Sequence, residues 1–177
     1  MCDLFPPSHI SHSLSFRLHP RPILICALPR TSNVYDFISI YLISVGIKKR
    51  GFGCGKINGF GGKIEQGETN EEAAKRELLE ESSVTGEGLK RVGFLKFFMT
   101  HIIMNVHVYT CYEFSGECEE SDEMKPMWVN VADIDYDKMW SDDRFWLPLV
   151  LKGKCVLARY EYESDDETIA DGETTEQ

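Results

Sequence analysis

Apolar and polar residues along the centre of the chain follow a pattern typical of strands, with a few helical segments between them. The run FISIYLISVGI at residues 37–47 is apolar and rich in β-branched residues, which predicts a buried strand too short to span a bilayer. Further strands are predicted at residues 89–99, 102–114, 125–131 and 155–162, and short helices at 133–139 and 143–151. Because strands and helices interleave irregularly, we expect an α+β fold in which a mixed β-sheet is sandwiched between helices.

One longer helix is predicted at residues 69–82. Thr69 is a suitable N-cap, and Glu72 follows three residues later, as a capping box requires. The glycine-rich segment 51–62 that precedes this helix predicts a loop.

The two ends of the chain differ in composition from its centre. Residues 1–36 hold most of the prolines and only two acidic residues, whereas residues 163–177 are acidic and lack aromatic residues. We predict an irregular N-terminal extension at 1–36, a single domain at 37–162 and a disordered acidic tail at 163–177. For the extension, a mitochondrial-type targeting segment is the alternative.

Charge and cysteine usage narrow the class of protein. Among 177 residues, 29 are acidic and 19 basic, a formal net charge of −10 that disfavours binding to DNA or RNA phosphates. The six cysteines are scattered singly, without a CxxC pair, which predicts reduced thiols in an intracellular protein. We expect a monomer in the cytoplasm, with neither a nucleic acid polymer nor a membrane as partner. A mitochondrial or nuclear fraction stays open.

Glutamates crowd the stretch GGKIEQGETNEEAAKRELLEESS at residues 61–83. On a helix, Glu77, Glu80 and Glu81 stand at i, i+3 and i+4, so their carboxylates project from one side. Near a glycine turn that offers backbone carbonyls, such a group suits Mg²⁺ or Mn²⁺. By spacing alone, a solvated acidic helix face is an equally good interpretation.

The spacing of these residues resembles the Nudix box, G-x5-E-x7-R-E-U-x-E-E-x-G-U, where U is aliphatic. The matching positions are Gly62, Glu68, Arg76, Glu77, Leu78, Glu80, Glu81 and Val84. The one departure is Ser83, where the family has glycine just after the helix. Serine would be strained there if the backbone requires a positive φ.

The resemblance implies a hydrolase that cleaves nucleoside diphosphates linked to another moiety, with a divalent metal on the box glutamates. By position, it assigns Glu77, Glu80 and Glu81 as metal ligands, with the carbonyl of Gly61 or Gly62 as a further ligand. Glu80 or Glu81 is also a candidate base. Arg76 would orient a neighbouring carboxylate.

Several other stretches resemble the MutT-type hydrolases of oxidised purine nucleoside triphosphates, such as 8-oxo-dGTP and 2-oxo-dATP. These stretches are KKRGFGCGKINGFGGKIEQGET, NVHVYT, ESDEMKPMWV and DKMWSDDRFWLPLV, within residues 47–162. This resemblance implies that Trp140 stacks on the base and that Asn58, Asp142 and Asp143 contact the base edge. The remaining pocket residues it implies are Phe52, Phe97, Met104 and Trp146 as walls, and Lys48 near the entrance.

The adjacent acids Asp142 and Asp143 admit two interpretations. In an apolar pocket one of them would stay protonated, so that a neutral acid donates to a purine O6 while an ionised one accepts from an N–H. Alternatively, one of the two is the N-cap of the helix that follows.

The sequence is therefore compatible with three functions. The first is hydrolysis of oxidised purine nucleoside triphosphates to monophosphate and pyrophosphate, which removes them from the nucleotide pool. The second is a Nudix hydrolase of another substrate, such as a dinucleoside polyphosphate or an RNA cap. The third is a weakly active nucleotide-binding module.

Overall fold

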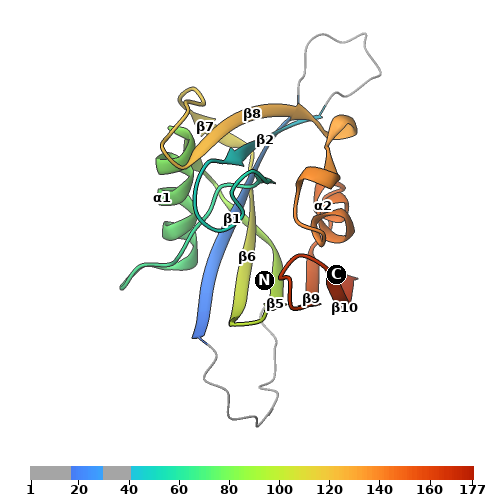
Figure 1. Ribbon diagram of the computed structural model, residues 1–177. Coiled ribbons are helices and arrows are strands. Elements are labelled where there is room, and N and C mark those ends of the chain that lie inside the picture. The colour runs from blue at the N-terminus through green and yellow to red at the C-terminus, as the bar shows by residue number, and fades with distance from the viewer. Residues whose placement is uncertain (1–16, 30–40) are drawn as a thin grey trace.

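A computed structural model describes residues 17–29 and 41–177 of the chain, which fold around one large mixed sheet (Figure 1). The eight-stranded sheet has the order β10–β9–β5–β6–β1–β2–β3, and β8 also pairs with β2. The strands in that order are Ile169–Glu176, Val156–Tyr162, Lys90–Phe98, Ile102–Cys111, Arg17–Pro29, Tyr41–Lys48 and Ile57–Asn58, with β8 at Met124–Asn130. A separate pair of short strands joins β4, Thr85–Glu87, to β7, Glu113–Ser115.

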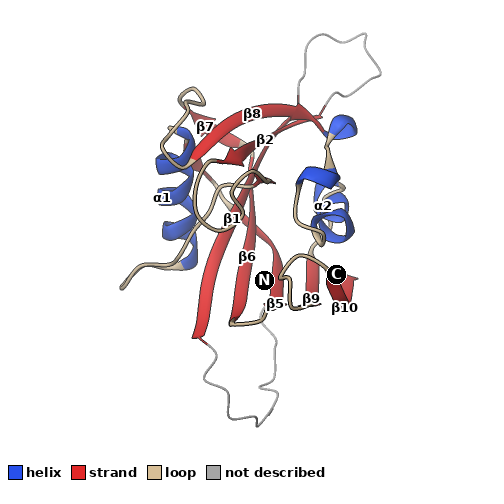
Figure 2. Cartoon of the chain, in the orientation of Figure 1, coloured by secondary structure: helices blue, strands red, loops and turns tan. Residues whose placement is uncertain are grey.

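The sheet lies between two α-helices, α1 at Asn70–Ser82 and α2 at Asp143–Leu151 (Figure 2). The predicted α+β class and its sandwich of a mixed sheet between helices are thereby confirmed. Among the described residues, no helix is long and apolar enough to cross a membrane.

Alternation along β6 divides the core into two parts. Met104, Val106 and Val108 belong to the cluster that includes Trp146 of α2, whereas Tyr109 belongs to the cluster on the side of α1. Successive side chains of a strand point to opposite faces, so one strand supplies both layers. The second cluster joins Phe60, Ala74, Leu78, Val84, Tyr109, Cys111 and Met124.

Most predicted elements occur with small shifts at their ends. The predicted strand at 102–114 is divided into β6 and β7, and the predicted helix at 133–139 is replaced by two 3₁₀ turns, Val131–Asp133 and Tyr136–Lys138. The N-cap Thr69 and its capping box with Glu72 are confirmed.

The N-terminal extension predicted at 1–36 is wrong for residues 17–29, which form β1. This strand pairs in parallel with β6 from Arg17 to Cys26 and antiparallel with β2 from Cys26 to Pro29. It therefore lies within the sheet, and the run RPILICAL supplies part of it. The rest of the predicted extension lies outside the described residues.

The disordered tail predicted at 163–177 is also wrong. Residues Ile169–Glu176 form β10, which pairs antiparallel with β9 at the edge of the sheet. An edge strand gains backbone hydrogen bonds on one side while its side chains stay in water, so it does not require apolar residues. The other limits of the predicted domain stay predictions.

Candidate active site

Helix α1 positions the glutamates of the box. Its capping box orders the first turn, and Glu77, Glu80 and Glu81 follow on the face that borders a pocket of about 810 Å³. The loop after β3 and the segment before β8 close this pocket, which we call the outer pocket. Its lining residues include Lys48, Arg50, Phe52, Gly61, Gly62, Arg76, Glu77, Glu80, Glu81 and Glu123.

The helix ends at Ser83 in the left-handed conformation, with φ 61° and ψ 16°. The Ser83 N–H donates to the carbonyl of Leu79 at 2.9 Å, which closes the last turn. A backbone conformation that favours glycine is therefore adopted by serine, so the departure from the box keeps the geometry at a cost of about 1 kcal/mol.

Arg76 connects several carboxylates at the mouth of the outer pocket. Its Nη1 lies 2.8 Å from Glu77 Oε1 and 3.1 Å from Glu80 Oε2, and its Nε lies 2.7 Å from Glu68 Oε1. The hydrogen bond from Arg76 holds the pKa of Glu68 below its usual value. Arg76 thus fixes Glu77 and Glu80, two of the three side chains that the resemblance assigned to the metal.

Glu81 is the most buried carboxylate of this group, with 2% of its surface exposed. Its Oε1 lies 2.6 Å from Lys48 Nζ, and its Oε2 accepts a hydrogen bond of 2.9 Å from the Gly61 N–H. Burial raises the pKa of Glu81, and the Lys48 ammonium opposes that rise. Lys48 also reaches Glu123 Oε2 at 3.1 Å, so one ammonium joins two acids.

The outer pocket fits a hard divalent cation, although its carboxylates are paired with Arg76 and Lys48. Among the described residues, no three acidic, histidine or cysteine side chains are gathered closely enough to hold a metal ion as they stand. The potential donors are nevertheless carboxylate oxygens beside the backbone of Gly61 and Gly62, which is the chemistry that Mg²⁺ prefers. A Cβ at Gly62 would lie 2.2 Å from Glu77 Oε1, so glycine is required for this close approach.

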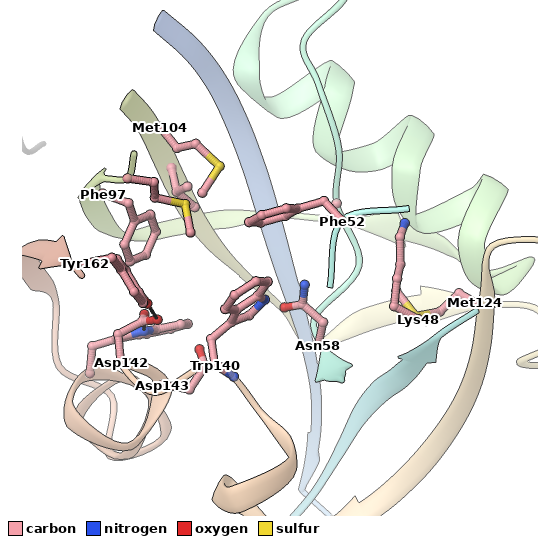
Figure 3. Close-up of a pocket in the computed structure, with 14 residues that line it drawn as sticks. Lys48, Phe52, Asn58, Phe97, Met104, Met124, Trp140, Asp142, Asp143 and Tyr162 are labelled. Carbon is pink, nitrogen blue, oxygen red and sulfur yellow. Dashed lines mark hydrogen bonds between the residues drawn. The ribbon is translucent and has the colours of Figure 1, made fainter. Parts of the chain in front are cut away.

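A second, narrower pocket of about 80 Å³ lies between the sheet and α2, and we call it the inner pocket (Figure 3). All nine residues that the sequence predicted for the base line it: Lys48, Asn58, Phe52, Phe97, Met104, Trp140, Asp142, Asp143 and Trp146. The outer pocket is wide and polar, whereas this one is narrow and walled by rings, so it suits a flat aromatic ligand.

Phe52 and Trp140 form the aromatic end of the inner pocket. Their rings stack with centroids 4.8 Å apart, and Lys56 Nζ lies 4.8 Å from the centroid of Trp140. Phe52 is 46% exposed and is carried by the glycine loop, where Gly51 and Gly53 have positive φ. A Cβ at Gly53 would lie 3.0 Å from the Trp140 ring, so this glycine lets the loop approach the indole.

Asp142 and Asp143 lie at the floor of the inner pocket and are 2% and 5% exposed. Asp142 Oδ2 accepts a hydrogen bond of 2.8 Å from Trp146 Nε1, and Tyr162 donates its hydroxyl to Oδ1. Asp143 Oδ2 accepts a hydrogen bond of 3.0 Å from the backbone N–H of Trp140. Although Asp142 occupies the N-cap position of α2, its side chain makes no capping hydrogen bond, which weighs against the structural interpretation.

The two acids differ in their titration. Burial and the neighbouring charge of Asp142 raise the pKa of Asp143 well above its usual value. Burial also raises the pKa of Asp142, but the donors Tyr162 and Trp146 oppose that rise. Two buried acids this close titrate as a pair, and the hydrogen bonds that Asp142 accepts favour its ionised form.

Two residues with important contacts were not assigned by sequence. Glu123 lies within the quoted stretch ESDEMKPMWV, whose likeness was the available signal, but its pairing with Lys48 depends on the fold. Tyr162 lies at the end of a predicted strand, and nothing in the sequence places its hydroxyl beside Asp142. Other wall residues that went unassigned are Met99, Val106 and Met124.

Comparison with known proteins gives the class of this chain. The model of the NUDIX domain matches residues 45–150, and the chain belongs to the Nudix family. Enzymes of this family generally use a divalent metal, so the oxygen-rich outer pocket is the expected place for one.

Individual relatives are more specific. The chain is 46% identical to the zebrafish (Danio rerio) oxidized purine nucleoside triphosphate hydrolase over 70% of this chain and 81% of that protein. It is 38% identical to the mouse (Mus musculus) protein of the same name, over 77% and 90%. In fold it is similar to the MutT protein of Bacillus halodurans, with a TM-score of 0.73 at 20% identity over 88% of this chain and 97% of that one.

Proposed function

We propose that this protein hydrolyses oxidised purine nucleoside triphosphates, such as 8-oxo-dGTP and 2-oxo-dATP, to monophosphate and pyrophosphate. The observation that carries the proposal is that the inner and outer pockets adjoin and share Lys48, Phe52 and Gly61 as lining residues. One molecule can therefore place a flat base in the narrow pocket and its phosphates in the wide, carboxylate-lined one. The names of the zebrafish and mouse relatives support this substrate class.

In the inner pocket, Trp140 supplies the stacking surface, worth about 1–3 kcal/mol per base. Asn58, Asp142 and Asp143 provide the hydrogen bonds to the base edge, while Phe97, Met104 and Trp146 form the walls. Phe52 covers the Trp140 ring, so the loop that carries it has to shift when a base stacks there.

In the outer pocket, we expect Mg²⁺, or Mn²⁺ in its place, on Glu77, Glu80 and Glu81 with a carbonyl of Gly61 or Gly62. When bound, the ion neutralises phosphate charge and acidifies a water. Glu80 or Glu81 would accept a proton from the attacking water, and Arg76 would hold the neighbouring carboxylates in place. Lys48, at the boundary of both pockets, is placed to neutralise phosphate charge.

Two alternatives rest on particular observations. The pairing of the box glutamates with Arg76 and Lys48, together with the left-handed Ser83, favours a weakly active nucleotide-binding module. The width of the outer pocket favours a Nudix hydrolase of a larger substrate, such as a dinucleoside polyphosphate or an RNA cap.

A nucleotide panel separates these functions. We would measure Mg²⁺-dependent pyrophosphate release by the full chain from 8-oxo-dGTP, 2-oxo-dATP and dGTP, and product formation from a dinucleoside polyphosphate and capped RNA. The proposal requires the oxidised triphosphates to give the highest kcat/KM. Preference for a capped or dinucleoside substrate overturns it, as does binding without turnover.

We also propose that the protein acts in the cytoplasm as a monomer, without a nucleic acid polymer or a membrane as partner. The net charge of −10 supports the absence of polyanion binding. Sedimentation tests the monomer, and cell fractionation tests both the cytoplasmic location and the absence of a membrane partner.

A further inference from the structure

Asp142 accepts hydrogen bonds at both of its carboxylate oxygens. The donor to Oδ2 is the indole N–H of Trp146 on α2. The donor to Oδ1 is the hydroxyl of Tyr162 at the end of β9, which points at Asp142 in Figure 3. An indole N–H only donates, and the Tyr162 hydroxyl also donates, so both oxygens of Asp142 act as acceptors. Asp142 is therefore surrounded as a carboxylate.

Asp143 has different surroundings. Among the described residues, its carboxyl accepts one hydrogen bond, from the backbone N–H of Trp140 to Oδ2. None of the ion pairs formed by the side chains of residues 42–177 involves either aspartate. The other titratable side chains that influence the pair are Lys56, Tyr136 and Tyr160, and none of these donates a hydrogen bond to Asp142.

We propose that Tyr162 is a specificity-determining residue, which fixes Asp142 as the acceptor and leaves the shared proton on Asp143. This inference rests on the proposed function. The pocket then presents a fixed order of acceptor and donor to the base, instead of a proton that moves between the two acids.

A fixed order distinguishes the two oxidised purines. Position 6 of the ring carries a carbonyl acceptor in guanine and an amino donor in adenine. A protonated Asp143 donates to the carbonyl but confronts the amino group with a second donor. Oxidised guanine is thus the preferred base, and oxidised adenine is accepted only if the proton moves to Asp142.

Moving that proton breaks the hydrogen bond from Tyr162. Proximity to Asp142 and burial also raise the pKa of the Tyr162 hydroxyl, so the phenol keeps its proton and remains a donor. Loss of a hydrogen bond to a charged group is typically worth tenfold or more in an equilibrium, so Tyr162 can set the choice between bases.

The test compares Tyr162→Phe with Tyr160→Phe. Both changes remove one phenol hydroxyl from β9. The hydroxyl of Tyr160, however, pairs with Thr174, and Tyr160 does not line the inner pocket. For each full-length variant we would measure kcat/KM for 8-oxo-dGTP and for 2-oxo-dATP, with the melting temperature as a record of folding.

In Tyr162→Phe the ratio of 8-oxo-dGTP to 2-oxo-dATP should fall by roughly tenfold, mainly because 2-oxo-dATP improves. In Tyr160→Phe the ratio should stay at the wild-type value. An unchanged ratio in a folded Tyr162→Phe overturns the inference alone. A wild-type protein that hydrolyses neither nucleotide overturns the proposed function as well.

A second measurement does not depend on the folding of Tyr162→Phe. Carbon NMR of aspartate carboxyls in the wild-type protein at neutral pH should show one neutral buried carboxyl, which disappears in Asp143→Asn and persists in Asp142→Asn. Loss of that signal in Asp142→Asn instead assigns the proton to the wrong acid and overturns the inference.

Discussion

The outer and inner pockets both gather carboxylates, but they compensate the negative charge in opposite ways. In the outer pocket, cationic side chains lie on the acids: Arg76 on Glu77 and Glu80, and Lys48 on Glu81. In the inner pocket, Asp142 and Asp143 have no ion-pair partner among the described residues, and neutral hydrogen-bond donors take that place.

This difference separates two tasks that acids perform. Carboxylates balanced by side-chain cations can exchange those partners for another cation, so the outer pocket is suited to metal and phosphate. Buried carboxyls held by neutral donors keep a fixed pattern of donors and acceptors, so the inner pocket is suited to reading a base. The pockets meet at Lys48, which lines both.

The largest expected effect follows from removing β1, because β2 and β6, between which it lies, both carry pocket residues. Deletion of residues 1–29 takes β1 from between β6 and β2, and we expect insoluble or unfolded protein. Deletion of residues 169–177 removes the edge strand β10 and should leave a folded protein with a lower melting temperature. Solubility and circular dichroism measure both. A soluble, active 1–29 deletion would show that the sheet closes without β1.

The next effect concerns the outer pocket alone. Glu81→Gln keeps the shape of the side chain but removes the charge, so turnover should fall by about a hundredfold or more while substrate preference stays the same. Glu71→Gln, a change on the exposed first turn of the same helix, is the control and should keep wild-type turnover. If Glu81→Gln retained near-normal turnover, Glu81 would not belong to the reacting centre.

A smaller effect is expected from Asp142→Asn in the inner pocket. An amide nitrogen cannot accept, so either Tyr162 or Trp146 is left without its acceptor, at about 1–3 kcal/mol. The kcat/KM for 8-oxo-dGTP should fall by roughly ten- to a hundredfold, with little change for the slow hydrolysis of dGTP. Asp137→Asn, whose acid pairs with Arg144 on the surface, should change neither value. A preserved ratio of 8-oxo-dGTP to dGTP would contradict base reading by Asp142.

The smallest expected effect is on stability as the pH changes. Burial and the charge of Asp142 raise the pKa of Asp143 in the folded protein, whereas an unfolded aspartate has a pKa of about 3.9. The stabilisation from a proton on Asp143 is complete below the unfolded pKa and is lost as pH rises towards the folded pKa, by at most about 1.4 kcal/mol per pH unit. Asp143→Asn lacks this loss.

Urea unfolding of both proteins from pH 5 to pH 8 measures the difference. Wild-type stability should decline relative to Asp143→Asn as pH rises. Parallel curves would mean that Asp143 titrates at an ordinary pKa.

Local signals predicted α1 well because its determinants are neighbours in sequence. Thr69 and Glu72 define its start, and the spacing of Glu77, Glu80 and Glu81 defines its functional face. The inner pocket was recognised through a family resemblance, and its nine predicted residues do line one cavity. The contact between Tyr162 and Asp142 was beyond reach, because the register that joins β9 to the start of α2 is a property of the whole sheet.

The missed strand β1 has a physical explanation. Its prolines at 20 and 22 argue against a central strand, because proline lacks the N–H that a ladder needs. Prolines two residues apart lack that group on the same edge, and β6 is the described strand that pairs with residues 17–25. One edge of this segment can thus carry both prolines without losing a hydrogen bond to β6.

The parallel pairing of β1 with β6 also has a consequence for folding during synthesis. Arg17 is opposite Ile102 and Cys26 is opposite Cys111, so β1 emerges from the ribosome long before the strand it pairs with. At the usual rate of synthesis, that delay is on the order of ten seconds. During this time the apolar run Ile23, Leu24 and Ile25 has no sheet to join. A nascent chain that stalls before β6 is made would expose these side chains to chaperones.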